Sequence, residues 1–175
     1  LGAHARHPRH GRRRARAVVR EDGGAARDRP LGGPAEREQR RIQRHLTEAR
    51  LPPGKTLDAF DFSLVPTLSK AQVMALTQGD AWLKAGHNLL AFGPPGAGKS
   101  HAAAAIGNEL VARGYRVFFT RTTDLVQRLQ AARQSLTLTQ EIARLDRFDL
   151  LILDDLSYVR KDQAETSVLF ELISA

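Results

Sequence analysis

The residues best suited to chemistry form one short run, Gly-Pro-Pro-Gly-Ala-Gly-Lys-Ser at residues 93–100. Two spaced glycines followed by Lys99 and Ser100 fit the phosphate-binding loop pattern. The glycines let backbone N–H groups turn toward phosphates, Lys99 reaches the outer phosphates, and Ser100 offers an oxygen to Mg²⁺. A helix beginning at the loop adds a dipole that favours an anion. The alternative is an ordinary Gly/Pro turn before a helix.

We therefore expect ATP and Mg²⁺ as ligands. The predicted cofactor-binding residues are Gly93, Pro94, Pro95, Gly96, Ala97, Gly98, Lys99, Ser100 and His101.

A second candidate group is the pair Asp154 and Asp155, which follows the apolar run 150–153. Nucleotide hydrolases with a phosphate loop hold Mg²⁺ with an Asp at the end of such a strand. We assign Asp154 and Ser100 to the metal. Asp155 then stands where a carboxylate could orient or deprotonate the attacking water, so the predicted catalytic residues are Lys99 and Asp155. Glu is commoner in that role, and the alternative for Asp155 is a cap for the next segment.

The elements that must position these residues alternate between strands and helices. The expected strands are 88–92, 116–120 and 150–153. The first expected helix is Lys99–Arg113, which ends at Gly114. A second is capped by Thr123 or Asp124 and ends near Gln134. A third is capped by Thr139 and a fourth by Asp162. This order predicts an α/β fold with a parallel sheet and flanking helices. The strand 150–153 is apolar throughout and is expected to be buried on both faces.

The segment upstream of the loop contains a charged helix and an extended linker. Ile42, Leu46 and Ala49 have helical spacing within residues 35–50. This basic helix either touches DNA or a partner, or rests on the domain. Downstream of it, Ser69 is expected to cap a helix from Lys70 to about Thr77, and Asp80 to cap a short turn. The expected core anchors are Phe60, Phe62 and Trp82, with the adenine pocket as the alternative for one of them.

The positive charge is concentrated before residue 51. Residues 1–50 carry fourteen arginines and no lysine against six acidic residues, whereas residues 51–175 carry equal numbers of basic and acidic residues. Residues 1–35 are rich in Arg, Ala, Gly and Pro, which predicts a disordered basic arm. Such an arm favours duplex DNA as a partner, since neutralised phosphates release counterions.

The composition excludes several classes of protein. The chain has no cysteine, which excludes a disulfide framework and a thiolate metal site. It has no apolar run of membrane-spanning length and no secretory signal, so we expect a cytoplasmic protein without membrane contact.

Six separate segments resemble the IstB-like ATPases, helper proteins of bacterial insertion-sequence transposition that are similar to the DnaC helicase loader. They are Lys55 to Phe62, Gly79 to Leu83, Gly93 to Ala105, Arg121 to Val126, Leu150 to Tyr158 and Glu165 to Ala175. The resemblance covers 36–175 and implies an AAA+ module that binds ATP, forms a homo-oligomer on DNA and assists a transposase. It also implies that Arg121, Arg128 and Arg133 approach a DNA backbone; a solvated helix face is the alternative. The expected parts are a disordered arm (1–35), a basic helix and linker (36–66), and the N-terminal part of the ATP-binding domain (67–175).

The resemblance also implies a further strand and an arginine finger beyond Ala175, with the further strand lying between 88–92 and 150–153. The chain is therefore expected to be truncated and its sheet incomplete. Since an arginine finger contributes about 10³–10⁵ in rate, we expect weak or absent ATP hydrolysis by this chain alone. The alternative functions are a DnaC-like helicase loader in DNA replication and a non-catalytic DNA-binding fragment.

Overall fold

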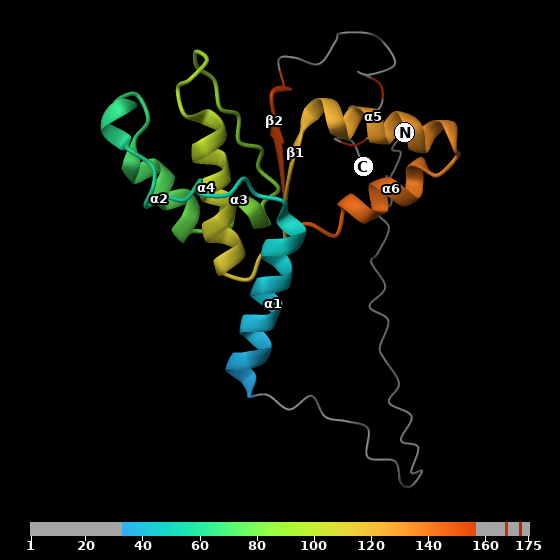
Figure 1. The fold of residues 1–175 in the computed structure, drawn as a ribbon, viewed down its shortest axis with the longest axis horizontal. Helices are drawn as coiled ribbons and strands as arrows, with labels where there is room; N and C mark the ends of the chain where they lie inside the picture. The colour runs from blue at the N-terminus through green and yellow to red at the C-terminus, as the bar shows by residue number, and fades with distance from the viewer. Residues whose placement is uncertain (1–32, 157–166, 168–171, 173–175) are drawn as a thin grey trace, which may run out of the picture. The chain divides into compact units, whose positions relative to one another are not determined.

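A computed structural model describes residues 33–156 together with Ser167 and Leu172 (Figure 1). Its elements are α1 (Pro34–Ala49), the 3-10 helix η1 (Phe62–Leu64), α2 (Lys70–Gln78), α3 (Ala81–Lys84), α4 (Lys99–Ala112), β1 (Val117–Arg121), α5 (Thr122–Gln134), α6 (Leu138–Leu145) and β2 (Leu150–Asp154). The disordered arm expected over 1–35 lies outside the described residues except for its last three. The helix expected after Asp162 also lies outside them, apart from Ser167 and Leu172, which are helical.

Two parallel strands form the sheet of the described residues. The register of β1 and β2 pairs Val117 with Leu150 and ends with Arg121 opposite Asp154. Both strands therefore end at the same edge, which is the edge where α4 begins (Figure 1). The expected α/β fold, with parallel strands and flanking helices, is confirmed.

Helices pack against both faces of this sheet. Successive strand side chains point to opposite faces, and the two core clusters follow that alternation. One cluster joins Val117, Phe119 and Ile152 to α1, α2 and α4. The other joins Phe118 to α5 and α6. In Figure 1, α2 and α4 accordingly lie on one side of the strands, and α5 and α6 on the other.

The basic helix α1 packs against the domain. Ala49 is fully buried in the same cluster as α4 and both strands, and Leu46 packs against that cluster. His45, which the predicted stripe did not include, is also buried. α1 thus belongs to the compact unit Gly32–Ala175.

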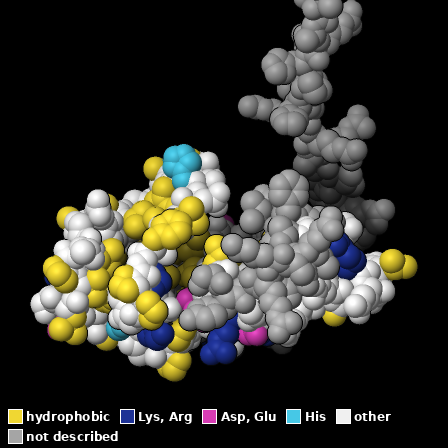
Figure 2. Space-filling view, turned by 90° about the horizontal axis from the view of Figure 1, so that it is seen from above, with side chains coloured by type: hydrophobic (Ala, Val, Ile, Leu, Met, Phe, Trp, Pro, Cys, Tyr) yellow, Lys and Arg dark blue, Asp and Glu magenta, His cyan; other side chains and the backbone are white. Residues whose placement is uncertain are grey.

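The expected strand 88–92 is wrong. These residues form no strand, and Leu89, Leu90 and Phe92 are 53%, 66% and 87% exposed. A strand needs a neighbour to accept and donate its backbone hydrogen bonds. Within the part of the chain that the structure describes, no strand lies beside 88–92. Figure 2 shows hydrophobic side chains at the surface in the view from above.

Four smaller expectations also need correction. α6 begins at Leu138 and not after Thr139, because burying Leu138 adds an apolar contact to the second cluster. α5 begins at Thr122, before both expected caps. Asp80 precedes α3, but its carboxylate accepts hydrogen bonds from Tyr115 and Lys84 and does not cap the helix.

The fourth concerns β2, in which Ile152 is buried while the other residues are partly exposed. Among the described residues β1 is its one neighbouring strand, so part of its surface stays uncovered.

Two local predictions about helix ends are confirmed. The Ser69 hydroxyl caps α2 by accepting from the Gln72 N–H at 3.3 Å. α4 ends at Ala112, and Gly114 has the positive φ of 92° that favours glycine after a helix.

No helix among the described residues is long and apolar enough to cross a membrane.

Leu110 and Leu90 provide a matched test of this packing. Leu110 is fully buried on α4 and Leu90 is 66% exposed. We expect Leu110→Ala to lower the free energy of unfolding by about 2–5 kcal/mol, because it leaves a cavity. Leu90→Ala should change it by less than about 0.5 kcal/mol. Urea denaturation measures both, and an equal loss for the two variants would show that residues 88–92 are packed.

Candidate nucleotide site

The run Gly93–Ser100, called here the phosphate loop, leads directly into α4. Gly96 and Gly98 have φ of 79° and 75°, values that L side chains rarely adopt. Gly98 is the residue before α4, and its carbonyl accepts the N–H of Ala102 at 2.8 Å. The N–H groups of the first helical turn have no partner within the helix, so they can donate hydrogen bonds to an anion bound at the loop.

Lys99 folds back over the phosphate loop. Its Nζ donates to the carbonyl oxygens of Gly93 at 2.9 Å and Pro94 at 2.8 Å. The ammonium is therefore held at the loop by weak acceptors. A phosphate oxygen carries more negative charge than a carbonyl oxygen and makes a stronger charge-assisted bond, so a bound phosphate would attract Lys99 away from them.

Ser100 and Asp154 meet where α4 begins and β2 ends. The Ser100 hydroxyl donates to Asp154 Oδ1 at 2.7 Å, and both residues are partly buried. A hydroxyl and a carboxylate are hard oxygen donors, the kind that Mg²⁺ prefers. Two predicted metal residues that are 54 positions apart thus supply adjacent oxygens, and this donor set fits Mg²⁺.

Asp155 follows β2 in a strained conformation. Its φ is 58°, in the left-handed region that non-glycine residues enter at a cost, and its side chain is exposed. Such strain is common at functional sites, where the surrounding structure imposes it. Because of this φ value, the backbone at Asp155 does not continue the extended conformation of β2, which ends at the metal candidate Asp154.

Thr122, which is not among the residues predicted from the sequence, supports this edge of the sheet. Its Oγ1 donates to the backbone carbonyl of Asp154 at 2.8 Å, and the residue is fully buried. The order of the strands and helices could have predicted this bond, because the carboxyl ends of parallel neighbouring strands meet at one edge. A hydroxyl just after one strand can therefore bond the end of the other.

The linker 55–65 packs against the base of the phosphate loop. Phe60 is 8% exposed, and a Cβ built on Gly98 would lie 3.1 Å from its Cε2. His101 Nε2 lies 3.1 Å from the Thr56 carbonyl oxygen, and its ring meets Phe60 edge-on with centroids 5.0 Å apart. His101, predicted to bind the cofactor, thus directs its imidazole toward this linker.

The other candidate residues lie elsewhere. Trp82 donates from Nε1 to the Leu76 carbonyl at 3.1 Å and packs, like Phe62, against the first core cluster. The two rings therefore serve as core anchors. Among the three arginines of α5 and its start, Arg121 is exposed, Arg128 forms an ion pair with Glu141, and Arg133 donates to Ser167 Oγ at 3.2 Å.

Residues 33–175 match the family described as IstB-like ATP binding protein. The chain belongs to this family. A protein of Sinorhizobium fredii, named "Putative insertion sequence ATP-binding protein", is 70% identical over 141 residues, which are 81% of this chain and 47% of the relative. The "Insertion sequence IS21 putative ATP-binding protein" of Pseudomonas aeruginosa is 36% identical over 79% of this chain and 52% of its own length. A Geobacillus stearothermophilus protein, named "Insertion sequence IS5376 putative ATP-binding protein", is 34% identical over 79% and 55%.

This IstB-like chain spans about half the length of the curated relatives it matches, between 47% and 55% for these three. The family supports the P-loop fold and an ATP-binding role in the context of insertion sequences. The matched range contains the phosphate loop, Ser100 and Asp154.

Gly98 and Gly96 separate backbone strain from the Phe60 contact. Alanine at either position carries the cost of a left-handed backbone, about 1–2 kcal/mol. Only Gly98→Ala also forces a Cβ against the Phe60 ring, because nothing lies within 4 Å of a Cβ on Gly96. We expect Gly98→Ala to lower the free energy of unfolding more than Gly96→Ala, as measured by urea denaturation. The excess should shrink when both are made in a Phe60→Ala background, and an excess that survives there would contradict the contact.

Proposed function

We propose that this IstB-like chain binds ATP with Mg²⁺ and takes part in insertion-sequence transposition as a DNA-binding helper of a transposase. The observation that carries the nucleotide half is the bond from Ser100 to Asp154, which unites the phosphate loop with the end of β2. An ordinary Gly/Pro turn would not need an acidic residue at that position.

The residues divide the work of holding a nucleotide. The first-turn N–H groups of α4 and Lys99 bind phosphate oxygens. Ser100 and Asp154 hold Mg²⁺, which when bound neutralises part of the phosphate charge. Asp155 is the proposed group that orients the attacking water; its exposure and turned backbone leave it accessible to solvent.

The context of insertion sequences supports the transposition half. The names of the three relatives above associate them with insertion sequences, and this favours a transposase as partner over the helicase of a replication loader. The arginine excess before residue 51 supports duplex DNA as a ligand. Assembly into a homo-oligomer on DNA belongs to the same proposal. Its test is ATP-dependent stimulation of strand transfer by the transposase of the same element; no stimulation with ATP bound would contradict it.

Lys99→Ala tests the phosphate contact. We expect ATP affinity to fall at least about tenfold, since a charge-assisted bond to phosphate is lost. The free energy of unfolding should hardly change, because Lys99 bonds two carbonyls of an exposed loop. Titration of a fluorescent ATP analogue measures the affinity. Lys84→Ala, at the exposed end of α3, is the control and should bind as the parent chain does. Equal affinity for Lys99→Ala and Lys84→Ala would contradict the site.

Asp154→Asn tests the metal assignment separately. Asparagine keeps an oxygen that can accept from Ser100 but removes the charge that holds a divalent cation. We expect ATP to bind this variant and the parent chain with similar affinity in EDTA, whereas the gain in affinity on adding Mg²⁺ is lost in the variant. The same titration with and without Mg²⁺ measures this gain. An undiminished gain in Asp154→Asn would remove Asp154 from the metal site.

A further inference from the structure

The amino ends of β1 and β2 carry a second charged feature, at the opposite edge of the sheet from the phosphate loop. Five arginines lie there, in α1 or directly after it, directly before β1, in α6 and in the turn before β2. We call this set the arginine end; it consists of Arg44, Arg50, Arg116, Arg144 and Arg147. Since β1 has five residues, this edge lies about 13 Å from the nucleotide edge, at the rise of an extended strand.

Two touching phenylalanine rings hold two of these arginines. The rings of Phe118 and Phe148 have centroids 5.1 Å apart. The Arg116 guanidinium carbon lies 5.1 Å from the Phe148 centroid, and that of Arg50 lies 5.7 Å from the Phe118 centroid. A guanidinium resting on a ring loses little of its hydrogen-bonding capacity, because its N–H groups point outward in the guanidinium plane. The rings therefore order two cations and leave donors for a ligand.

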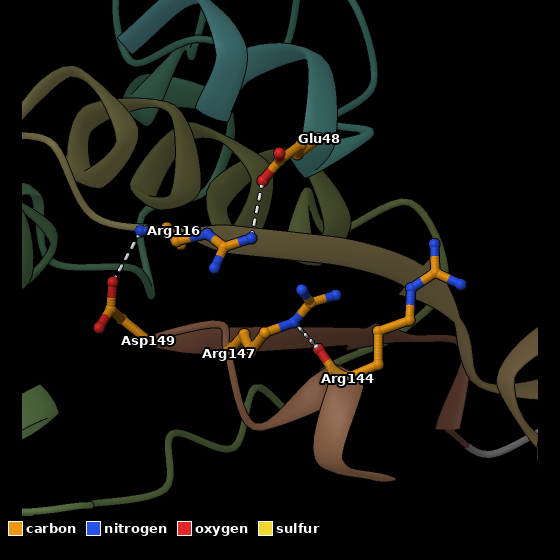
Figure 3. A network of polar contacts seen from close by, with 5 residues as sticks. All are labelled: Glu48, Arg116, Arg144, Arg147 and Asp149. Carbon is orange, nitrogen blue, oxygen red and sulfur yellow. Dashed lines mark hydrogen bonds and ion pairs between the residues drawn. The ribbon is translucent and has the colours of Figure 1, made fainter. Parts of the chain in front are cut away.

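The other three arginines are Arg44, which comes from α1, and Arg144 and Arg147, which precede β2. Arg44 and Arg116 line one shallow hollow with His45 and Glu48. Arg147 Nε lies 3.5 Å from the Arg144 carbonyl oxygen, and Asp149, two residues further on, accepts the Arg116 backbone N–H at 2.7 Å. Figure 3 shows the side chains of Arg116, Arg144 and Arg147 on the same side of the two strands. Arg44 therefore adjoins Arg116, and Arg144 and Arg147 lie on the same side of the strands as Arg116.

Two acids of this surface, Glu48 and Asp149, are engaged by Arg116, and a third, Asp146, is exposed at the end of α6. Glu48 Oε2 lies 2.9 Å from Arg116 Nη2, and this hydrogen bond is the main cause that lowers the pKa of Glu48. Asp149 bonds the Arg116 backbone. Arg44, Arg50 and Arg147 have no ion pair with an acidic residue of the described range. Arg144 Nη1 lies 3.9 Å from Glu141 Oε1, and Glu141 also forms an ion pair with Arg128. The five arginines therefore outnumber the three neighbouring acids Glu48, Asp146 and Asp149, and positive charge is in excess.

We infer that the arginine end binds the phosphate backbone of duplex DNA. The inference rests on the proposed DNA-binding function and names the surface that carries it. Guanidinium groups match phosphate oxygens in charge and in their paired N–H geometry. Charged residues are depleted from the centre of protein–protein interfaces, whereas protein–DNA interfaces are strongly positive. The exposed large hydrophobic residues of the described range lie outside the arginine end, which favours DNA over an acidic protein segment.

The first test removes two of the free charges from the complete 175-residue chain. In Arg50→Gln/Arg147→Gln, both changed residues are exposed and outside the nucleotide site. The matched control Lys70→Gln/Lys84→Gln removes two charges from α2 and α3. Anisotropy of a short fluorescein-labelled duplex gives the dissociation constant between about 50 and 200 mM salt. We expect the arginine variant, but not the control, to bind more weakly and to lose about two units of the slope of log affinity against log salt. Arg50→Lys/Arg147→Lys should recover most of the loss, and ATP affinity should stay unchanged in all three.

The second test locates the DNA directly and is independent of the arginines upstream of α1. The chain has no cysteine, so Arg147→Cys and Lys84→Cys each introduce one site for a photoreactive maleimide. We expect crosslinks to the duplex from position 147 and not from position 84.

The outcomes separate this inference from the proposed function. If the parent chain binds the duplex but the arginine variant binds as tightly as its control, and position 147 gives no crosslink, the surface is wrong and DNA binding stands. If the parent chain does not bind the duplex at all, both are wrong. If it instead binds a polyglutamate peptide, and the arginine variant weakens that binding, the surface belongs to an acidic protein segment and the DNA inference is overturned.

Discussion

The hydrogen bond between Ser100 and Asp154 is the contact on which the nucleotide site depends, because it links the start of α4 to the end of β2. It can form only if α4 lies close to the sheet. Gly107 permits that approach: a Cβ there would lie 2.9 Å from Ile152 Cδ1 and from Leu51 Cδ2. Leu110 and Val111, both fully buried, then fix the helix in the first core cluster. The site is thus a consequence of how a helix packs on a strand.

The nucleotide site is supported from two directions. On the sheet side, the parallel register places Arg121 opposite Asp154, so that Thr122 bonds the Asp154 carbonyl. On the other side, Phe60 closes against Gly98. This second support explains why an aromatic residue in a linker is buried although it belongs to no helix or strand. A loop that must expose its backbone N–H groups to a ligand cannot use them to hold itself in place, so neighbouring segments do so.

Much of the site could be predicted because its signals are local. The glycine spacing, the hydroxyl after Lys99 and the two acids after an apolar run depend on residues next to one another. The prediction of 88–92 as a strand failed because an apolar run is only a candidate for a strand; its hydrogen bonds come from a neighbour that the run does not encode. The same limit applies to His101, whose direction depends on Thr56 and Phe60, far away in the sequence. Asp80 stands directly before α3, but its carboxylate accepts hydrogen bonds from the Tyr115 hydroxyl and the Lys84 ammonium and none from the first turn of the helix.

The two edges of the sheet show why net charge alone says little about this chain. Residues 51–175 are neutral overall, yet Arg116, Arg144 and Arg147 lie together at one edge while Asp154 and Asp155 lie at the other. Arg116 has a different task from its neighbours, since its bond to Glu48 fastens α1 to β1 and so brings Arg44 and Arg50 to the same edge. Arg116 therefore has a structural role, which is to hold α1 where Arg44 and Arg50 lie near the start of β1. Because the two edges share no residue, a nucleotide and a polyanion can be bound together without competing for the same side chains.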